Sequence, residues 1–310
     1  MKAFEKRLTV LGPILIFLAA MLWASDGPFR FHLAQELTPS FIVLIEHLIN
    51  SVLVIPFLLM GWSEIKSLKW QQWLALLFIG IGASAFATIL FTQAFMYVNP
   101  SVAIVLQKLQ PLFAILLAVT FLKEQTGKRF WSWALLALIG AYVISFPNLR
   151  PELYVGEAWN PNTLGILCSI GAAALWGAGT VVGRYALKTV SFKTVASLRL
   201  FIAFLFLAVW NSPSVISQSF GALTGKDVLF LVIISLTSGF ISLFLYYRGL
   251  STTKASIATI AELGFPFLAV IVNAVTLGLF LTPMQFAGMA LLILAVWQLT
   301  NINRREMPAS

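Results

Sequence analysis

The chain has 310 residues, of which 60% are hydrophobic and only 10% are charged, so it has too little polar surface to cover a soluble globule of this size. Its net charge of +9 lies mostly in short connections, and no basic patch alternates with exposed aromatic residues, so we expect no nucleic-acid partner. Cys168 is the sole cysteine, which excludes an intrachain disulfide and a cysteine-based metal cluster.

Apolar runs long enough to cross a bilayer recur along the whole chain and indicate an all-α integral membrane protein. Residues 1–25 mimic a signal peptide, but more apolar runs follow, so we interpret them as part of an uncleaved first helix. The breaks between the runs predict ten transmembrane helices, at 9–30, 39–61, 71–96, 100–122, 130–147, 163–186, 193–211, 227–247, 255–278 and 284–301.

The basic residues of the connections predict how these helices are oriented. With the N-terminus in the cytoplasm, fifteen lysines and arginines fall in cytoplasmic connections and three, Arg30, Arg150 and Lys226, in outer ones, while Lys108 and Arg199 lie within spans. Such a one-sided distribution follows the positive-inside rule. We therefore expect a multi-pass protein of the cell (inner) membrane with both termini in the cytoplasm.

The first half of the sequence is similar to the second. The segment "GPILIFLAAMLWA" (12–24) aligns with "GILCSIGAAALWG" (165–177) at an offset of 153, and "PSVAIVLQKLQPLFA" (100–114) aligns with "ASIATIAELGFPFLA" (255–269) at an offset of 155. Each half contains five predicted spans, an odd number, so the second half must enter the membrane upside down relative to the first. Inverted repeats of this kind are an architecture of secondary transporters.

These features resemble the EamA-type repeat of the drug/metabolite transporter (DMT) superfamily. The resemblance rests on four features: "AAMLWAS" (19–25) with "AAALWGA" (172–178), the aligned polar residues Glu46 and Arg199, the prolines of "LQPLFA" and "GFPFLA", and "FLKEQTGKRFWSWALLALIGAYVI" (121–144). It implies a first repeat at 1–152 with spans 1–5 and a second, inverted repeat at 153–310 with spans 6–10. It also implies a central cavity between the repeats, with the fifth and tenth helices more peripheral.

Polar residues inside the predicted spans are the candidate functional residues. A charge at bilayer depth costs at least about 2.5–3.5 kcal/mol on insertion scales, so it normally faces a partner or a water-filled cavity. We expect Asp26 and Arg199 to act in gating or proton coupling. The substrate cavity is expected to include Trp23, Glu46, His47, Gln93, Gln107, Lys108, Gln110, Trp176 and Glu262.

Two prolines sharpen this prediction. Pro111 and Pro266 each remove the helical hydrogen bond to the carbonyl four residues earlier, and those carbonyls belong to the aligned residues Gln107 and Glu262. The freed carbonyls either line a cavity or are satisfied by a neighbouring hydroxyl at a simple kink.

Several pairings are open from the sequence alone. Lys108 and Glu46 form either a buried pair for which the substrate competes or a permanent structural pair. Asp26 and Arg30, four residues apart, form either a local ion pair or a gate at the mouth of the cavity. His47 either is a satisfied packing histidine or carries a coupling proton.

Two further residues each have one open question. Arg199 is expected near the cytoplasmic side of its helix, where its side chain would snorkel to the surface. Trp176, like its counterpart Trp23, either packs against neighbouring helices or lines the cavity.

The function predicted is a secondary transporter that works by alternating access, with proton coupling and facilitated exchange both open. We expect an exporter of small polar metabolites such as amino acids, because mixed acidic and basic groups suit a zwitterion. No phosphate-binding loop for ATP occurs. The alternative is an integral-membrane enzyme acting on a lipid or another membrane-associated substrate, for which the adjacent pair Glu46–His47 is the sole hint.

The remaining expectations concern bound groups and partners. We expect no catalytic residue and no cofactor, and no metal site either, because the chain has only two histidines and no "HExxH" spacing. The expected partners are the small-molecule substrate and the lipid bilayer. The oligomeric state is not predicted.

Overall fold

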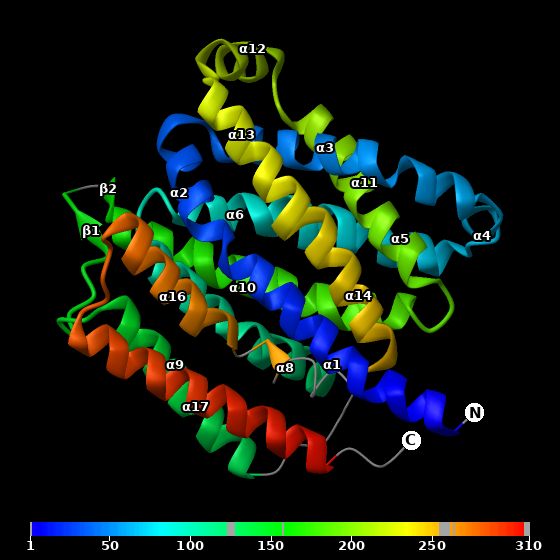
Figure 1. Ribbon diagram of the computed structural model, residues 1–310. Coiled ribbons are helices and arrows are strands. Elements are labelled where there is room, and N and C mark those ends of the chain that lie inside the picture. The colour runs from blue at the N-terminus through cyan, green and yellow to red at the C-terminus, as the bar shows by residue number, and fades with distance from the viewer. Residues whose placement is uncertain (1, 123–127, 157, 254–260, 263, 307–310) are drawn as a thin grey trace.

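The computed structural model describes residues 2–122, 128–156, 158–253, 261–262 and 264–306, and this part of the chain is almost entirely helical (Figure 1). The helices of the first half are α1 (Lys2–Ala24), α2 (Asp26–Glu36), α3 (Pro39–Met60), α4 (Trp62–Lys66), α5 (Trp70–Leu77), η1 (Phe78–Phe86), α6 (Ala87–Ala94), α7 (Pro100–Leu106), η2 (Gln107–Leu109), α8 (Gln110–Leu122) and α9 (Lys128–Ser145). Two short antiparallel strands, β1 (Tyr154–Val155) and β2 (Ala158–Trp159), follow. The helices of the second half are α10 (Pro161–Ala186), α11 (Phe192–Trp210), α12 (Pro213–Ala222), α13 (Gly225–Ile234), η3 (Ser235–Ile241), α14 (Ser242–Thr252), α16 (Gly264–Leu277) and α17 (Pro283–Glu306).

Within the described residues, seven helical stretches are long and apolar enough to cross a membrane: Leu11–Glu36, Pro39–Met60, Trp70–Ala94, Pro100–Leu117, Pro161–Ala186, Phe192–Trp210 and Gly225–Thr252. They coincide with the first four predicted spans and with the sixth, seventh and eighth. The other three predicted spans coincide with shorter apolar helices, Arg129–Ser145, Phe265–Leu277 and Pro283–Leu299. The ninth predicted span begins outside the described residues. The structure therefore confirms an all-helical, multi-pass membrane protein with seven long spans, and the number ten stays a prediction.

The first predicted span ends too early. Helices α1 and α2 are separated only by Ser25, and Pro28 does not break α2 because it lies in the first turn, where a backbone N–H has no helical acceptor. Arg30 is consequently buried, with 2% of its surface exposed, and does not lie in an outer connection. Arg150 and Lys226 are then the basic residues of the predicted outer connections.

Two spans contain π-helical segments at matching positions. Segment η1 lies in the third predicted span and η3 in the eighth, and the offset of 155 places the last residue of η1 on the last residue of η3. Segments of this type occur frequently at functional sites. In the fourth predicted span, the 3₁₀ turn η2 separates α7 from α8 just before Pro111.

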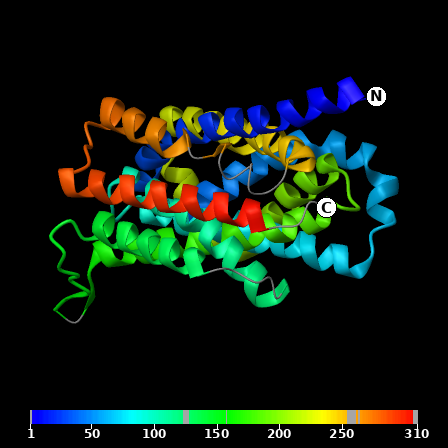
Figure 2. The same cartoon turned by 90° about the horizontal axis from the view of Figure 1, so that it is seen from below.

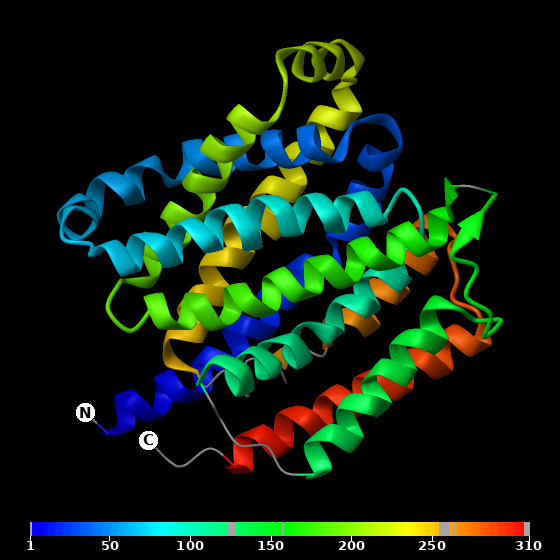
Figure 3. The same ribbon diagram turned by 180° about the vertical axis from the view of Figure 1, so that it is seen from behind.

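Helices α9 and α17 pack mainly on each other along one edge of the bundle (Figures 1 and 3). A Cβ atom on Gly140 would lie 2.6 Å from the backbone nitrogen of Leu292, and one on Gly288 would lie 2.6 Å from the backbone nitrogen of Ile144. The two contacts are reciprocal, because each glycine lies against the residue four positions after the other glycine. Glycine at both positions lets the two backbones approach closely.

The buried apolar side chains form two main clusters. The larger includes residues of α2, α7, α9, α10 and α17, and the smaller includes residues of α1, α11 and α14. Trp23 packs against both clusters. It therefore lies where the two parts of the apolar core meet.

Figure 2 shows that α1 begins and α17 ends at the same end of the bundle. Helix α4 lies at this end as well, whereas β1 and β2 lie at the opposite end (Figures 1 and 2). The long helices run between these two ends.

Candidate substrate site

A cavity of about 130 Å³ lies inside the helix bundle, and residues from both halves of the chain line it. Ten of the eleven side chains predicted from the sequence lie on its wall: Trp23, Asp26, Glu46, His47, Gln107, Lys108, Gln110, Trp176, Arg199 and Glu262. Of the described residues, those of α9 and α17 do not take part in this wall. The structure thus brings most of the predicted residues together, while their roles in binding, gating or coupling stay predictions.

Gln93 is the residue that the structure does not bring to the cavity. Its Nε2 lies 3.0 Å from the hydroxyl of Tyr97, one helical turn further along. Phe91 does line the cavity, and Gln93, two residues later, is about 200° further round the helix. Gln93 therefore faces away from the site.

The internal repeat supplies matching positions to the wall. At the offset of 153 the matched positions are Trp23–Trp176, Glu46–Arg199 and His47–Leu200. At the offset of 155 they are Ser84–Gly239, Thr88–Leu243, Phe91–Tyr246, Gln107–Glu262 and Gln110–Phe265. The two halves therefore contribute matching positions to the cavity wall, but, apart from the two tryptophans, the side chains at these positions differ. The positions of the site are repeated, while its charges are not.

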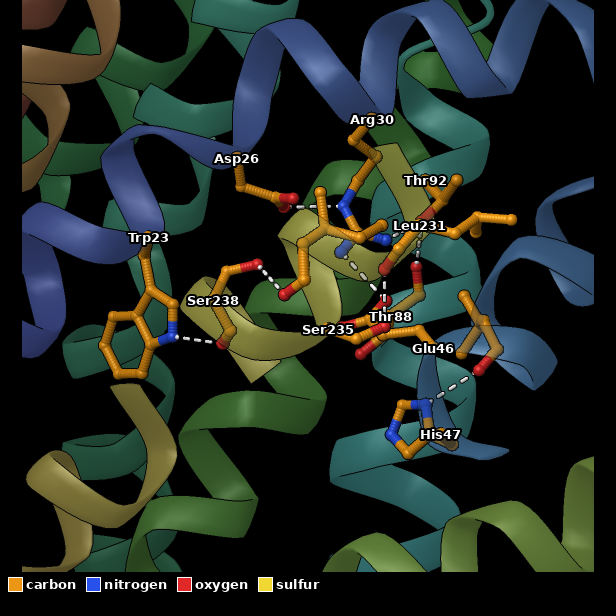
Figure 4. Close-up of polar contacts among 12 residues, drawn as sticks. Trp23, Asp26, Arg30, Glu46, His47, Thr88, Thr92, Leu231, Ser235 and Ser238 are labelled. Carbon is orange, nitrogen blue, oxygen red and sulfur yellow. Dashed lines mark hydrogen bonds and ion pairs between the residues drawn. The ribbon is translucent and has the colours of Figure 1, made fainter. Parts of the chain in front are cut away.

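Arg30 joins two carboxylates in the wall of the cavity (Figure 4). Its Nε lies 2.6 Å from Oδ2 of Asp26, and its Nη2 lies 2.9 Å from Oε2 of Glu46 on α3. Its Nη1 donates a hydrogen bond of 2.9 Å to Oγ1 of Thr92 on α6. Because these charged side chains are buried, their mutual pairing offsets the cost of removing them from water. The local pair of Asp26 with Arg30 is thus one part of a larger cluster.

Lys108 does not pair with Glu46, contrary to one hypothesis from the sequence. Among the described residues, the Glu46 carboxylate pairs with Arg30. The Lys108 ammonium lies 4.4 Å from the ring centre of Phe265 and interacts electrostatically with Glu262. The hypothesis fails because the sequence pattern assigns Arg30 to an outer connection and so leaves it out as a partner.

Arg199 does not snorkel to the surface. Its Nε donates a hydrogen bond of 2.6 Å to Oγ of Ser84, its Nη1 one of 3.0 Å to the hydroxyl of Tyr247, and its Nη2 one of 2.9 Å to the carbonyl of Ala83. Two of these partners, Ala83 and Ser84, belong to the π-helical segment η1. The guanidinium is thus held inside the bundle, on the cavity wall.

His47 is bonded to its own helix. Its Nδ1 lies 2.8 Å from the carbonyl oxygen of Val43, four residues earlier (Figure 4). A carbonyl oxygen only accepts hydrogen bonds, so Nδ1 carries the proton and Nε2 of the neutral ring is an acceptor. This contact fits the alternative of a satisfied packing histidine, and proton transfer by His47 stays a prediction.

One backbone hydrogen bond recurs at the two proline breaks. The N–H of Gln110 donates to the carbonyl of Gln107, and the N–H of Phe265 donates to the carbonyl of Glu262 at 3.1 Å. The carbonyls predicted to be freed by the prolines are therefore engaged by a tighter turn of three residues. What each break presents to the cavity is the side chain of Gln107 or Glu262.

Aromatic rings surround these polar groups. The indole N–H of Trp23 donates a hydrogen bond of 3.0 Å to the carbonyl of Ser238, and its ring centre lies 5.2 Å from that of Tyr246 (Figure 4). The ring centre of Trp176 lies 5.2 Å from that of Phe91. Both tryptophans therefore pack against neighbours and line the cavity.

Sequence reasoning missed part of the wall. The residues it missed include Arg30, Ser84, Thr88, Phe91, Thr180, Ser238, Tyr246 and Phe265. The hydroxyl residues carry no charge that would single them out in an apolar helix. The repeat itself could have found Phe265, because it aligns with Gln110 at the offset of 155.

The chemistry that this cavity offers is non-covalent binding. It combines aromatic surface, hydrogen-bonding amides and hydroxyls, and charges of both signs. Within the described residues, no group of three or more His, Cys, Asp or Glu side chains is placed to hold a metal ion.

Comparison with known proteins places the chain among transporters. The model of the EamA-like transporter family matches residues 10–146 and 163–301. The riboflavin transporter ImpX of Fusobacterium nucleatum subsp. nucleatum is 33% identical over 300 residues, covering 94% of this chain and 98% of the relative. The uncharacterized transporter YwfM of Bacillus subtilis is 21% identical, covering 96% of each chain.

One solved crystal structure also resembles this chain. It superposes with a TM-score of 0.64 and covers 96% of this chain and 99% of the other, at 18% sequence identity. At that identity the similarity shows the fold alone.

Proposed function

The chain belongs to the EamA-like transporter family, and we propose that it carries riboflavin, or a close chemical relative, across the membrane through the central cavity. The observation that carries this proposal is the similarity to a riboflavin transporter along nearly the whole of both chains. We propose a carrier and not an enzyme, because the family and the relatives are transporters.

The wall of the cavity suits such a substrate. Riboflavin is a flat, polar ring system that carries a chain of hydroxyl groups. Trp23, Trp176 and Tyr246 offer aromatic faces on which a flat ring can pack. Gln107 and Glu262 offer oxygens that accept hydrogen bonds from the substrate.

An amino acid is the second candidate substrate, as expected from the sequence. The observation that favours it is that Lys108 and Glu262 carry opposite charges on the wall of the same cavity. A zwitterion could place its carboxylate on the ammonium of Lys108 and its own ammonium on the carboxylate of Glu262. Transport of amino acids without transport of flavins would select this candidate.

We propose that transport proceeds by alternating access between two inverted repeats, 1–152 and 153–310. One observation supports this arrangement: the matched positions of the two halves meet at one cavity.

We propose that the protein exports its substrate and that proton movement supplies the energy. Protonation of Asp26 would remove one of the two negative charges that hold Arg30, and so change the charge balance of the link that Arg30 makes from α2 to Glu46 on α3. Arg199 would act as a gate in the same way, because it ties α11 to η1. Facilitated exchange without protons is the alternative.

We place the chain in the inner membrane with both termini in the cytoplasm. The common location of the start of α1 and the end of α17 at one end of the bundle supports a shared side for both termini. The excess of basic residues in the connections at that end supports the cytoplasmic assignment.

The decisive experiment is a transport assay with purified protein in liposomes. Labelled riboflavin and a panel of labelled amino acids are offered in separate reactions, with protein-free liposomes as the control. We expect movement of riboflavin, and a pH-sensitive dye in the lumen then reports whether protons move with it. Conversion of a lipid without movement of any solute would overturn the transport proposal.

A further inference from the structure

The charged groups of the cavity differ in how fully the protein already engages them. Each of the three guanidinium nitrogens of Arg30 has a protein partner, on Asp26, Glu46 or Thr92. Each guanidinium nitrogen of Arg199 has one as well. Both arginines are therefore occupied by the fold, and the groups that recognise the substrate must be sought elsewhere on the wall.

Two acceptor oxygens at the helix breaks are not engaged. Oε1 of Gln107 and Oε1 of Glu262 are both buried and have no hydrogen-bond partner among the described residues. Glu262 is only 7% exposed, and both residues line the cavity. A buried acceptor without a donor is costly to the fold, so a ligand that supplies the donor is favoured at this place.

The repeat relates these two acceptors to each other. Gln107 and Glu262 are separated by the offset of 155, and the backbone carbonyl of each accepts a hydrogen bond from the residue three positions later, directly before a proline. The two residues therefore occupy equivalent positions of the repeat, and the difference between them lies in the chemistry of their side chains. Gln107 carries an amide, and Glu262 carries a carboxyl group.

An amide and a carboxylate recognise different parts of a flavin. An amide offers one acceptor beside one donor, which complements the imide edge of the ring, where the N3–H donor lies beside a carbonyl acceptor. A carboxylate offers acceptors only, which complements hydroxyl groups. Riboflavin carries both features at opposite ends of the molecule.

We infer that Gln107 forms hydrogen bonds with the imide edge of the flavin ring and that Glu262 accepts hydrogen bonds from the hydroxyl chain. The two proline breaks would thereby orient the substrate across the cavity. This assignment rests on the proposed function, since it names the groups that recognise the substrate of that same site. It makes Gln107 and Glu262 the specificity-determining residues of the carrier.

Two flavin analogues separate the two contacts. 3-Methylriboflavin lacks the N3–H donor, and lumiflavin lacks the hydroxyl chain. Binding to the purified full-length protein is measured by quenching of flavin fluorescence, and Kd values are compared within each variant. We expect the wild-type protein to bind riboflavin about tenfold more tightly than either analogue, as the loss of one good hydrogen bond predicts.

The variants should abolish one preference each. In Gln107→Leu, the preference for riboflavin over 3-methylriboflavin should fall to about one, while the preference over lumiflavin stays near tenfold. In Glu262→Met, the preference for riboflavin over lumiflavin should fall to about one, while the preference over 3-methylriboflavin stays near tenfold. Both Kd values of a ratio are measured in the same variant. A general effect on flavin binding, such as Lys108 losing its counter-charge, therefore cancels in the ratio. Gln93→Leu, the same kind of change at a glutamine outside the cavity, should keep both preferences.

Conservative variants guard against loss of folding. Gln107→Glu and Glu262→Gln each keep an acceptor oxygen, so each should keep the preference that the apolar variant loses. The assignment would be overturned if Gln107→Leu or Glu262→Met kept both preferences, or if each variant lost the preference expected to be lost in the other. The proposed function would stand in either case. Absence of riboflavin binding to the wild-type protein would overturn both.

Discussion

Arg30 is the residue on which the buried charges of the cavity depend. It bonds Asp26 within its own helix, Glu46 on α3 and Thr92 on α6, so one side chain links three helices. The loss of one partner from a buried ion cluster is strongly destabilising because it leaves the remaining charges unpaired.

Replacing Arg30 by methionine should therefore lower the free energy of unfolding by about 3–5 kcal/mol. The triple variant Asp26→Asn, Arg30→Met, Glu46→Gln carries no charge at this cluster and should recover most of the loss. Thermal unfolding of the purified protein in detergent, followed by size-exclusion chromatography, measures both. A triple variant as unstable as the single one would contradict this explanation.

Most of the candidate site could be predicted from one rule, that polar residues inside long apolar runs face a cavity or a partner. The rule found Lys108 and Glu262 because their chemistry is costly in lipid. It misplaced Gln93, because it considers the type of residue and not the face of the helix. It assigned Arg30 to an outer connection and not to the cavity wall, because Gly27 and Pro28 look like the end of a helix, while in the folded chain they occupy a first turn.

At the scale of elements, the contact between α9 and α17 depends on two glycines. A methyl group at Gly140 would meet the backbone of Leu292, and backbone atoms cannot move aside as a flexible side chain can. Overpacking of this kind typically costs 1–3 kcal/mol. The pair is thus held by the close approach of its backbones.

Gly140→Ala should consequently lower the apparent Tm, although alanine is the better helix former by roughly 0.5–1 kcal/mol. Gly221→Ala is the matched control, because a Cβ atom there meets nothing within 4 Å. This control should leave the Tm unchanged or raise it slightly. Both variants are compared with the parent protein in one thermal unfolding assay, and equal effects of the two substitutions would refute the packing argument.

A second contact between elements joins the two halves at the end where α1 begins. Glu64 of α4 accepts hydrogen bonds from the backbone N–H of Ser191 at 2.6 Å, from the hydroxyl of Ser191 at 2.7 Å and from the hydroxyl of Thr194. These residues form the N-terminus of α11, where a negative charge is favourable. Partial burial raises the pKa of Glu64, but the hydrogen bonds from Thr194 and Ser191 outweigh it, so that the pKa is lowered from its usual value.

The lowered pKa fixes the pH dependence of this contact. Glu64 stabilises the fold at a pH above its unfolded-state value, near 4.5, and this contribution disappears as the pH falls through the lower folded-state pKa. Glu64→Gln should lower the apparent Tm by roughly 2–4 °C at neutral pH. The difference from the parent protein should shrink in unfolding scans as the pH is lowered from 4.5 through the folded-state pKa, and a difference that does not depend on pH would contradict the charge-based explanation.

The whole molecule orients itself in the membrane through its connections. Basic residues gather in the connections on the proposed cytoplasmic side, and the burial of Arg30 makes the distribution more one-sided, since it removes a charge from the outer side. The orientation is thus encoded in parts of the chain that do not line the cavity.

Reporter fusions test this orientation. A fluorescent protein fused to either terminus should fluoresce, because it folds in the cytoplasm, and alkaline phosphatase fused to either terminus should be inactive there. Alkaline phosphatase fused after residue 150, in a predicted outer connection, should be active and serves as the positive control. An active phosphatase at one of the termini would overturn the orientation.

At this scale the sequence predicted the class of protein and the internal repeat, because both depend on the hydrophobic pattern of long segments. It could not predict how α1 continues into α2, or where π-helical segments replace α-helix. Those details depend on contacts between helices that are distant in sequence, such as the hydrogen bonds of Arg199 with Ala83 and Ser84.

The π-helical segments η1 and η3 set which side chains of the following helix face the cavity in each half. A π-helical turn holds about one residue more than an α-helical turn, so it shifts by one position the side chains that point in a given direction beyond it. Both segments end at the same position of their repeats. The matched pairs Thr88–Leu243 and Phe91–Tyr246, which follow them, therefore reach the cavity wall in the same register.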